Sequence, residues 1–105
     1  MIRIVTLDAI DHTISGQYSP GDMLVLLCDA TLNAFTAVLP DTASLRDVVI
    51  FVKKIDSTAN VITLSPIAGQ NVDGSTSMTL ESQYESEILV PSTANYYRFA
   101  NSAFV

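Results

Sequence analysis

The chain contains few residues that could carry out chemistry. His12 is its only histidine and Cys28 its only cysteine. His12 follows Asp11, but neighbouring residues of a strand point to opposite faces, so the two side chains do not form a catalytic pair. Cys28 lies in the apolar run 23–28, where no basic or histidine side chain would lower the pKa of its thiol. We therefore expect an exposed turn residue at position 12 and a buried, unreactive thiol at position 28.

Metal and cofactor sites are not predicted. One cysteine and one histidine cannot supply the four ligands of a structural zinc site. The segment 56–60, with the sequence DSTAN, lacks the alternating acidic ligands and the closing glutamate of a calcium-binding EF-hand loop. We interpret it as a hairpin turn.

Glu81, Glu85 and Glu87, together with Tyr84, form an acidic and aromatic pattern that could serve a glycosidase or a sugar platform. Carboxylates at such spacing are also common on solvated acidic surfaces, which is the interpretation we prefer. We predict no enzymatic activity. The residues that remain candidates for contacts with a partner or a glycan are Tyr84, Tyr96 and Tyr97.

The charge balance restricts the partners. Five Lys and Arg residues against eleven Asp and Glu residues give a net charge of −6, so the cationic stripe that nucleic acids require is missing. Lys53 and Lys54 are adjacent and are expected at a solvated strand edge. The apolar runs are too short to insert into a membrane as helices. Asp8 interrupts the start of the chain before the apolar core of a signal peptide could form.

The composition also predicts self-association. Hydrophobic residues make up 49% of the chain and charged residues only 15%, with a mean hydropathy of +0.36. Small monomers need more charge than this to cover their surface. We therefore expect part of the apolar surface to be buried against other copies of the chain.

The pattern of the sequence predicts a single all-β domain. Short runs rich in Val, Ile, Thr and aromatic residues alternate with clusters of turn-forming residues, which is typical of a β-sandwich. We predict an antiparallel, jelly-roll-like sandwich of eight to nine short strands, with one helical turn at 42–47. The expected strands are 2–7, 13–15, 23–28, 35–39, 48–55, 61–65, 77–80, 86–90 and 96–100.

Some of these strands are apolar on both faces. In the run 48–55, alternation places Val48, Ile50 and Val52 on one face, and Val49 and Phe51 on the other. A two-layer sandwich covers only one face of each sheet, so such a strand requires a third layer from another copy of the chain or from a partner protein. The residues expected in the core or in a subunit interface are Val25, Leu27, Leu39, Ile50, Val52, Ile62, Leu64, Leu80, Ile88 and Val90.

Several segments, taken in order, resemble the β module that recurs in bacteriophage tail-fibre, head-fibre and capsid-decoration proteins. The chain differs from that pattern at 45–47, where the module often has glycine, and at 93–96, where it has Gly-Thr-Asn-Trp. The resemblance implies a homotrimer on the outside of the virion that contacts other virion proteins. The segments that carry it are 29–30 (DA), 35–40 (FTAVLP), 51–64 (FVKKIDSTANVITL), 70–74 (QNVDG), 80–86 (LESQYES) and 95–97 (NYY).

Three functions stay open at this point. The favoured one is a structural virion protein, a capsid-decoration or head-fibre module. The alternatives are a tail-fibre or receptor-binding tip that contacts a host-surface glycan, and an enzyme such as a depolymerase. Residues 1–12 lie outside the resemblance and are interpreted either as a strand for attachment to the virion or as the first strand of the module's own sheet, followed by the sandwich module 13–105. The attachment residues expected there are Ile2, Ile4, Val5 and Leu7.

Overall fold

The chain folds almost entirely into strands. The computed structural model describes residues 1–14 and 16–99, and within these residues the only helical element is the single 3-10 turn η1 (Thr42–Leu45). The strands are β1 (Ile2–Asp8), β2 (Met23–Asp29), β3 (Phe35–Val38), β4 (Val49–Lys54), β5 (Ile62–Ser65), β6 (Asn71–Val72), β7 (Met78–Leu80), β8 (Ser86–Ser92) and β9 (Asn95–Phe99).

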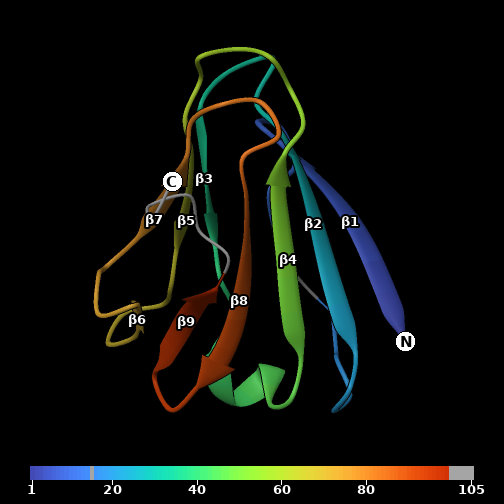
Figure 1. Ribbon diagram of the computed structural model, residues 1–105, viewed down its shortest axis with the longest axis vertical. Helices are drawn as coiled ribbons and strands as arrows, with labels where there is room; N and C mark the ends of the chain where they lie inside the picture. The colour runs from blue at the N-terminus through green and yellow to red at the C-terminus, as the bar shows by residue number, and fades with distance from the viewer. Residues whose placement is uncertain (15, 100–105) are drawn as a thin grey trace.

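These strands form two mixed sheets (Figure 1). The larger sheet has the order β1-β2-β4-β8-β9-β6, and the smaller has the order β3-β5-β7. The pairs β1–β2, β2–β4, β3–β5 and β6–β9 are parallel, whereas β4–β8, β8–β9 and β5–β7 are antiparallel. The all-β prediction is confirmed, and the prediction of an antiparallel arrangement is wrong.

Two of the parallel pairs, β2–β4 and β3–β5, follow from how the chain crosses between the sheets. Strands β2 and β4 lie side by side in the larger sheet, with Cys28 paired to Lys54 at their ends. Beyond those ends the chain passes into the smaller sheet twice, to β3 and to β5, which again pair in parallel. Residues 56–60 therefore form one of these crossings, and the predicted hairpin turn is wrong.

Other boundaries differ less from the prediction. Residues 13 and 14 of the predicted strand 13–15 are not in a strand, and residue 15 lies outside the described part, as does residue 100 of the predicted strand 96–100. The two-residue strand β6 was not predicted. The helical turn at 42–47 is confirmed as η1, which Asp41 caps by accepting a 2.9 Å hydrogen bond from the N–H of Ala43.

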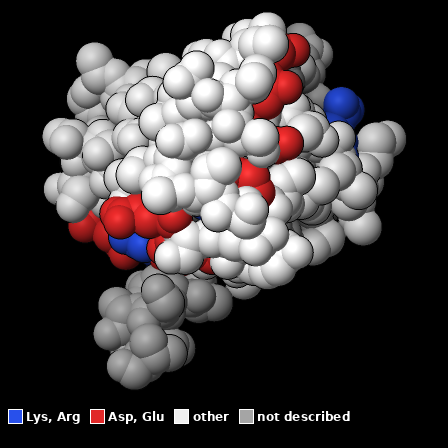
Figure 2. All heavy atoms as spheres, turned by 90° about the horizontal axis from the view of Figure 1, so that it is seen from above, with Lys and Arg blue, Asp and Glu red and all other residues white. Residues whose placement is uncertain are grey.

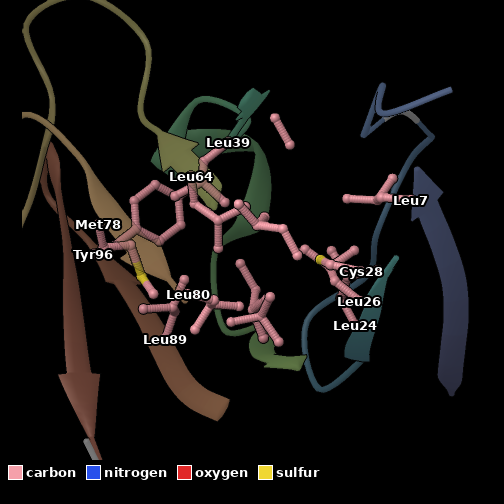
Figure 3. Close-up of a cluster of buried hydrophobic side chains, with 14 of the residues drawn as sticks. Leu7, Leu24, Leu26, Cys28, Leu39, Leu64, Met78, Leu80, Leu89 and Tyr96 are labelled. Atoms are coloured by element: carbon pink, nitrogen blue, oxygen red, sulfur yellow. The ribbon is translucent and has the colours of Figure 1, made fainter. Parts of the chain in front are cut away.

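One hydrophobic core lies between the two sheets. Figure 3 shows Leu24, Leu26 and Leu89 of the larger sheet and Leu64 and Leu80 of the smaller sheet, and all five are fully buried. Six of the ten residues expected in the core or an interface are buried. They are Leu39, Ile50, Val52, Ile62, Leu64 and Leu80. The other four, Val25, Leu27, Ile88 and Val90, are half-buried on the outer face of the larger sheet.

Strand β1 is part of the larger sheet and not a separate segment. It pairs with β2 from Ile2 to Asp8, opposite Met23 to Asp29. Leu7 belongs to the hydrophobic core and is 1% exposed. β1, which lies before the boundary expected after residue 12, is therefore a strand of the larger sheet.

A buried ion pair lies where the chain crosses between the sheets. The Nζ atom of Lys54 is 2.6 Å from Oδ2 of Asp56, and both side chains are almost completely buried. Lys54 also donates to the carbonyl of Thr58 at 2.9 Å. The expected solvated lysine edge is therefore wrong for Lys54, because alternation along β4 places its side chain on the core side, whereas Lys53 is exposed on the outer face.

The carboxylate of Asp56 joins the two crossings. Its Oδ1 atom accepts the N–H of Ala30, just after β2, at 2.8 Å, and its Oδ2 atom accepts the N–H of Thr58 at 3.1 Å and the Thr58 hydroxyl. The Asn60 side chain completes the link by donating to the carbonyl of Ala30 at 2.8 Å. Burial acts to raise the pKa of Asp56, but the hydrogen bonds from Lys54, Thr58 and Ala30 outweigh it and hold the pKa well below its ordinary value.

Asp56→Ala is expected to lower the free energy of unfolding by about 3–5 kcal/mol, because it leaves the Lys54 ammonium buried without its counter-ion. The pKa of Asp56 is lower in the folded chain than in the unfolded one. This contribution is therefore complete above the unfolded pKa of about 4 and is lost as the pH falls further. Urea denaturation followed by circular dichroism at pH 7 and at pH 3 measures it, and the difference between wild type and variant should shrink at pH 3.

The matched control is Asp11→Ala, which removes a carboxylate from an exposed residue. It should change the stability by less than about 0.5 kcal/mol. If Asp56→Ala is as mild as this control at the same protein concentration, the ion pair does not hold the crossings.

Candidate interaction surface

The outer face of the larger sheet carries a band of apolar side chains that crosses several strands. Alternation along each strand turns one set of side chains toward the core and the other set outward. The strand register aligns the outward set into a row that crosses five strands from β1 to β9. This row, called the apolar row below, consists of Ile4, Val25, Phe51, Ile88 and Phe99.

Further apolar residues lie next to this row. Ile2, Met23 and Val49 are paired neighbours on one side of it, and Val90 pairs with Tyr97. Toward the other end of the strands the face becomes polar at Lys53 and Ser86. The double-faced pattern of 48–55 is thus confirmed, but alternation could not show that the outward residues of five strands fall into one row.

The relief of this face is uneven. Ile4 is 67% exposed at one end of the apolar row and Phe99 is 53% exposed at the other, whereas Val25, Phe51 and Ile88 are half-buried between them. A hollow of about 270 Å³ lies at this middle part, lined by Val25, Leu27, Phe51 and Ile88, with Lys53 and Ser86 at its polar end.

Charge is sparse on this molecule. Figure 2 views it from above relative to Figure 1 and shows a mostly uncharged surface, with the carboxylates in a few small groups. None of the five residues of the apolar row is charged. Contiguous exposed apolar patches mark interaction sites in soluble proteins.

The three tyrosines predicted as contact residues do not form one site. Tyr96 is fully buried in the core, where its hydroxyl donates to the carbonyl of Pro40 and burial raises its pKa, so its assignment to a surface contact is wrong. Tyr97 is 46% exposed on the outer face and pairs with Val90. Tyr84 is 62% exposed, and its ring lies 5.6 Å from the Nζ atom of Lys53.

Tyr84 and Tyr97 lie at different levels of the sheet. The N–H of Tyr84 donates to the carbonyl of Lys54 at 2.7 Å. Tyr97 of β9 pairs with Val90 of β8, and the preceding residue of β8, Leu89, pairs with Ile50 near the other end of β4. Ile50 and Lys54 are four residues apart, which is about 13 Å along a strand. A single sugar ring would not contact both tyrosines.

The four predicted attachment residues have different surroundings. Ile2 and Ile4 are 62% and 67% exposed on the outer face. Val5 is half-buried and packs against the core, and Leu7 is buried. Of these four, Ile2 and Ile4 therefore offer side chains to a partner, and within the described part of the chain no strand pairs with the second edge of β1.

The residues with reactive side chains are held by structural contacts. The ring of His12 stacks on Phe35 with centroids 5.4 Å apart, so it is not simply an exposed turn residue. Burial, with a smaller contribution from the charge of Asp56, raises the pKa of the Cys28 thiol to about 12. Glu87 is buried in an ion pair with Arg98, and Glu85 accepts the N–H of Glu81 at 2.7 Å.

Within residues 1–14 and 16–99, no group of three or more His, Cys, Asp or Glu side chains is placed to hold a metal ion. No helix in this part of the chain has the length and apolarity to cross a membrane. Comparison with protein-family models, with curated proteins and with solved structures found no match to the chain.

We expect Cys28 to resist thiol reagents in the folded protein, because its side chain is fully buried and its pKa is raised to about 12. Incubation with an aromatic disulfide reagent at pH 8 should leave the thiol unmodified, and addition of denaturant should release one reactive thiol per chain. Rapid modification without denaturant would contradict the burial of this residue.

Proposed function

We propose that this chain is a structural module of a bacteriophage virion that assembles as a homotrimer on the capsid surface, as a decoration or head-fibre protein. The observation that carries the proposal is the apolar outer face of the larger sheet, because such a face needs a covering layer. The resemblance of its segments to the phage β module supplies the virion context.

The residues that carry the resemblance have structural roles in the fold. Lys54, Asp56, Thr58 and Asn60, in the segment 51–64, hold the two crossings together. Asp73 and Gly74, in the segment 70–74, both have positive φ and form the two-residue turn between Val72 and Ser75. A module whose shared residues serve its scaffold fits a structural protein better than an enzyme.

Attachment to the capsid is assigned to β1 in this proposal. Among the described residues no other strand pairs with its second edge, although at the end of the strand the N–H of Asp8 donates to the carbonyl of Asp11. An open edge can accept an extended segment of another virion protein through main-chain hydrogen bonds.

A receptor-binding tip of a tail fibre is the second candidate. One observation favours it: the ring of Tyr84 is 62% exposed, and the nearby Lys53 ammonium lies over it. An exposed ring of this kind can stack against a sugar. This function would place the chain at the tail.

Light scattering after gel filtration should give about three times the chain mass of 11.3 kDa. Phe51→Glu should reduce this to the mass of one chain without loss of the circular dichroism spectrum, because it places a charge in the middle of the apolar row. The control is Thr36→Glu, at an exposed position of the smaller sheet, which should leave the oligomer intact. A monomeric wild-type protein would overturn the proposal.

The position on the virion is tested with gold-labelled antibodies on purified particles of the phage that encodes the chain. Label on the heads is the expected result. Label at the end of the tail would favour the receptor-binding tip, and virions without label would contradict both functions.

A further inference from the structure

A second hollow, called the polar hollow below, lies at the end of the molecule where β4 begins. Its volume is about 480 Å³, within the roughly 300–1,000 Å³ that small-molecule sites occupy. Three segments that are far apart in the sequence form it: residues 41–47 around η1, Gln70 before β6, and residues 91–94 at the turn between β8 and β9. Figure 1 shows η1 beside this turn at the lower end of the molecule.

Side-chain hydrogen bonds join the walls of the polar hollow. The Oδ1 atom of Asp41 accepts the side-chain amide of Gln70 at 2.9 Å, and the Oε1 atom of Gln70 accepts the N–H of Thr42 at 3.0 Å. The Thr42 hydroxyl in turn accepts the N–H of Ala94 at 3.2 Å. The three segments are thus held in place without a ligand, which lowers the entropic cost of binding one.

Two residues that line the polar hollow have a left-handed backbone. The φ angle is 60° at Asp47 and 56° at Ala94, where glycine would be free of strain. Both are held by backbone hydrogen bonds: the carbonyl of Asp47 accepts the N–H of Gly21 at 2.8 Å, and that of Ala94 accepts the N–H of Asn71 at 3.1 Å. Strain of this kind concentrates where a protein fixes the shape of a ligand site.

Hydrogen-bonding groups remain unused at the polar hollow. Among the described residues, none forms a hydrogen bond or an ion pair with the guanidinium of Arg46, and none donates to Oδ2 of Asp41. The hydrogen bonds from Ala43 and Gln70 to Asp41 hold the pKa of this carboxyl below its ordinary value, so it is an acceptor at neutral pH. The hydroxyl of Thr42 still has its own hydrogen to donate.

We propose that the polar hollow binds a neutral saccharide. Each hydroxyl group of a sugar both donates and accepts, so a sugar pairs with Asp41 as acceptor and with Arg46 and Thr42 as donors. This inference goes beyond the structural role proposed above and does not depend on the oligomeric state.

Other classes of ligand fit the polar hollow less well. An anion would meet the carboxylates of Asp41 and Asp47 against the single guanidinium of Arg46, on a chain with a net charge of −6. A cation would meet Arg46, and the described residues contain no group of three side chains placed to hold a metal ion. The lining includes no aromatic ring on which a nucleobase would stack. An uncharged ligand rich in hydroxyl groups matches these conditions.

The polar hollow is separate from Tyr84, the possible sugar contact of the second candidate function. The N–H of Tyr84 donates to the carbonyl of Lys54, which is the last residue of β4. Residues 41–47 instead precede Val49, the first residue of β4. The two places lie at opposite ends of this strand, so sugar binding in the polar hollow requires no contact with Tyr84.

The test is a titration of the isotope-labelled wild-type protein, followed through its backbone amide signals in nuclear magnetic resonance spectra. The probes are glucose, galactose, mannose and N-acetylglucosamine. At least one of them should shift the signals of 41–47, 70 and 92–94 to saturation and leave those of 81–86 unchanged. If no probe shifts these signals at high millimolar concentration, or if the shifts are confined to 81–86, the inference is wrong.

Arg46→Ala should weaken the affinity for that sugar at least tenfold and leave the circular dichroism spectrum unchanged, because no described residue depends on this guanidinium for a hydrogen bond. The matched control is Lys53→Ala, which removes the same charge from an exposed residue near the other end of β4 and should bind like wild type. Thr93→Trp places an indole at the rim of the polar hollow and should abolish the shifts. Binding that is unaltered in both Arg46→Ala and Thr93→Trp would overturn the assignment.

A free sugar and the last residue of a glycan chain present the same hydroxyl groups. The methyl glycoside of the sugar that binds best separates these sources, because its anomeric oxygen carries a substituent as it does in a chain. Retained affinity identifies the end of a glycan as the ligand, and a loss of at least tenfold identifies the free sugar. Light scattering on the same sample is an independent result: a monomer that binds the sugar would overturn the proposed trimer and leave this inference in place.

Discussion

The carboxylate of Asp56 is the point on which the architecture depends. It neutralises the buried ammonium of Lys54 at 2.6 Å and accepts the N–H of Ala30 at 2.8 Å. Lys54 ends β4 and Ala30 follows β2, so one side chain joins the two places where the chain leaves the larger sheet. A buried charge without its partner costs several kcal/mol, which makes this arrangement difficult to rearrange.

Holding both crossings together relates the directions of two strand pairs, β2–β4 and β3–β5. Since β2 and β4 leave the larger sheet at the same end, β3 and β5 must enter the smaller sheet in the same direction. The larger sheet has six strands and the smaller sheet has three. The smaller sheet covers the core side, and the outer face of the larger sheet keeps its apolar side chains.

The proposed assembly follows from that remaining face. Its register places Ile4, Phe51 and Phe99 in the same row although they are far apart in the sequence. A chain with a net charge of −6 associates most easily through a surface without charge. The Lys54–Asp56 ion pair thus stabilises the fold whose outer face is the surface through which we propose that copies of the chain bind one another.

The sequence by itself determined the all-β class, most strand positions and the apolar character of both faces of 48–55, because alternation and turn residues are local signals. It did not reveal that Lys54 is buried, that Tyr96 belongs to the core or that β2 and β4 are parallel. These features depend on which strands become neighbours, and strand order and register arise from contacts between distant residues. Only the tertiary structure therefore decided that the outward residues of five strands form one apolar row.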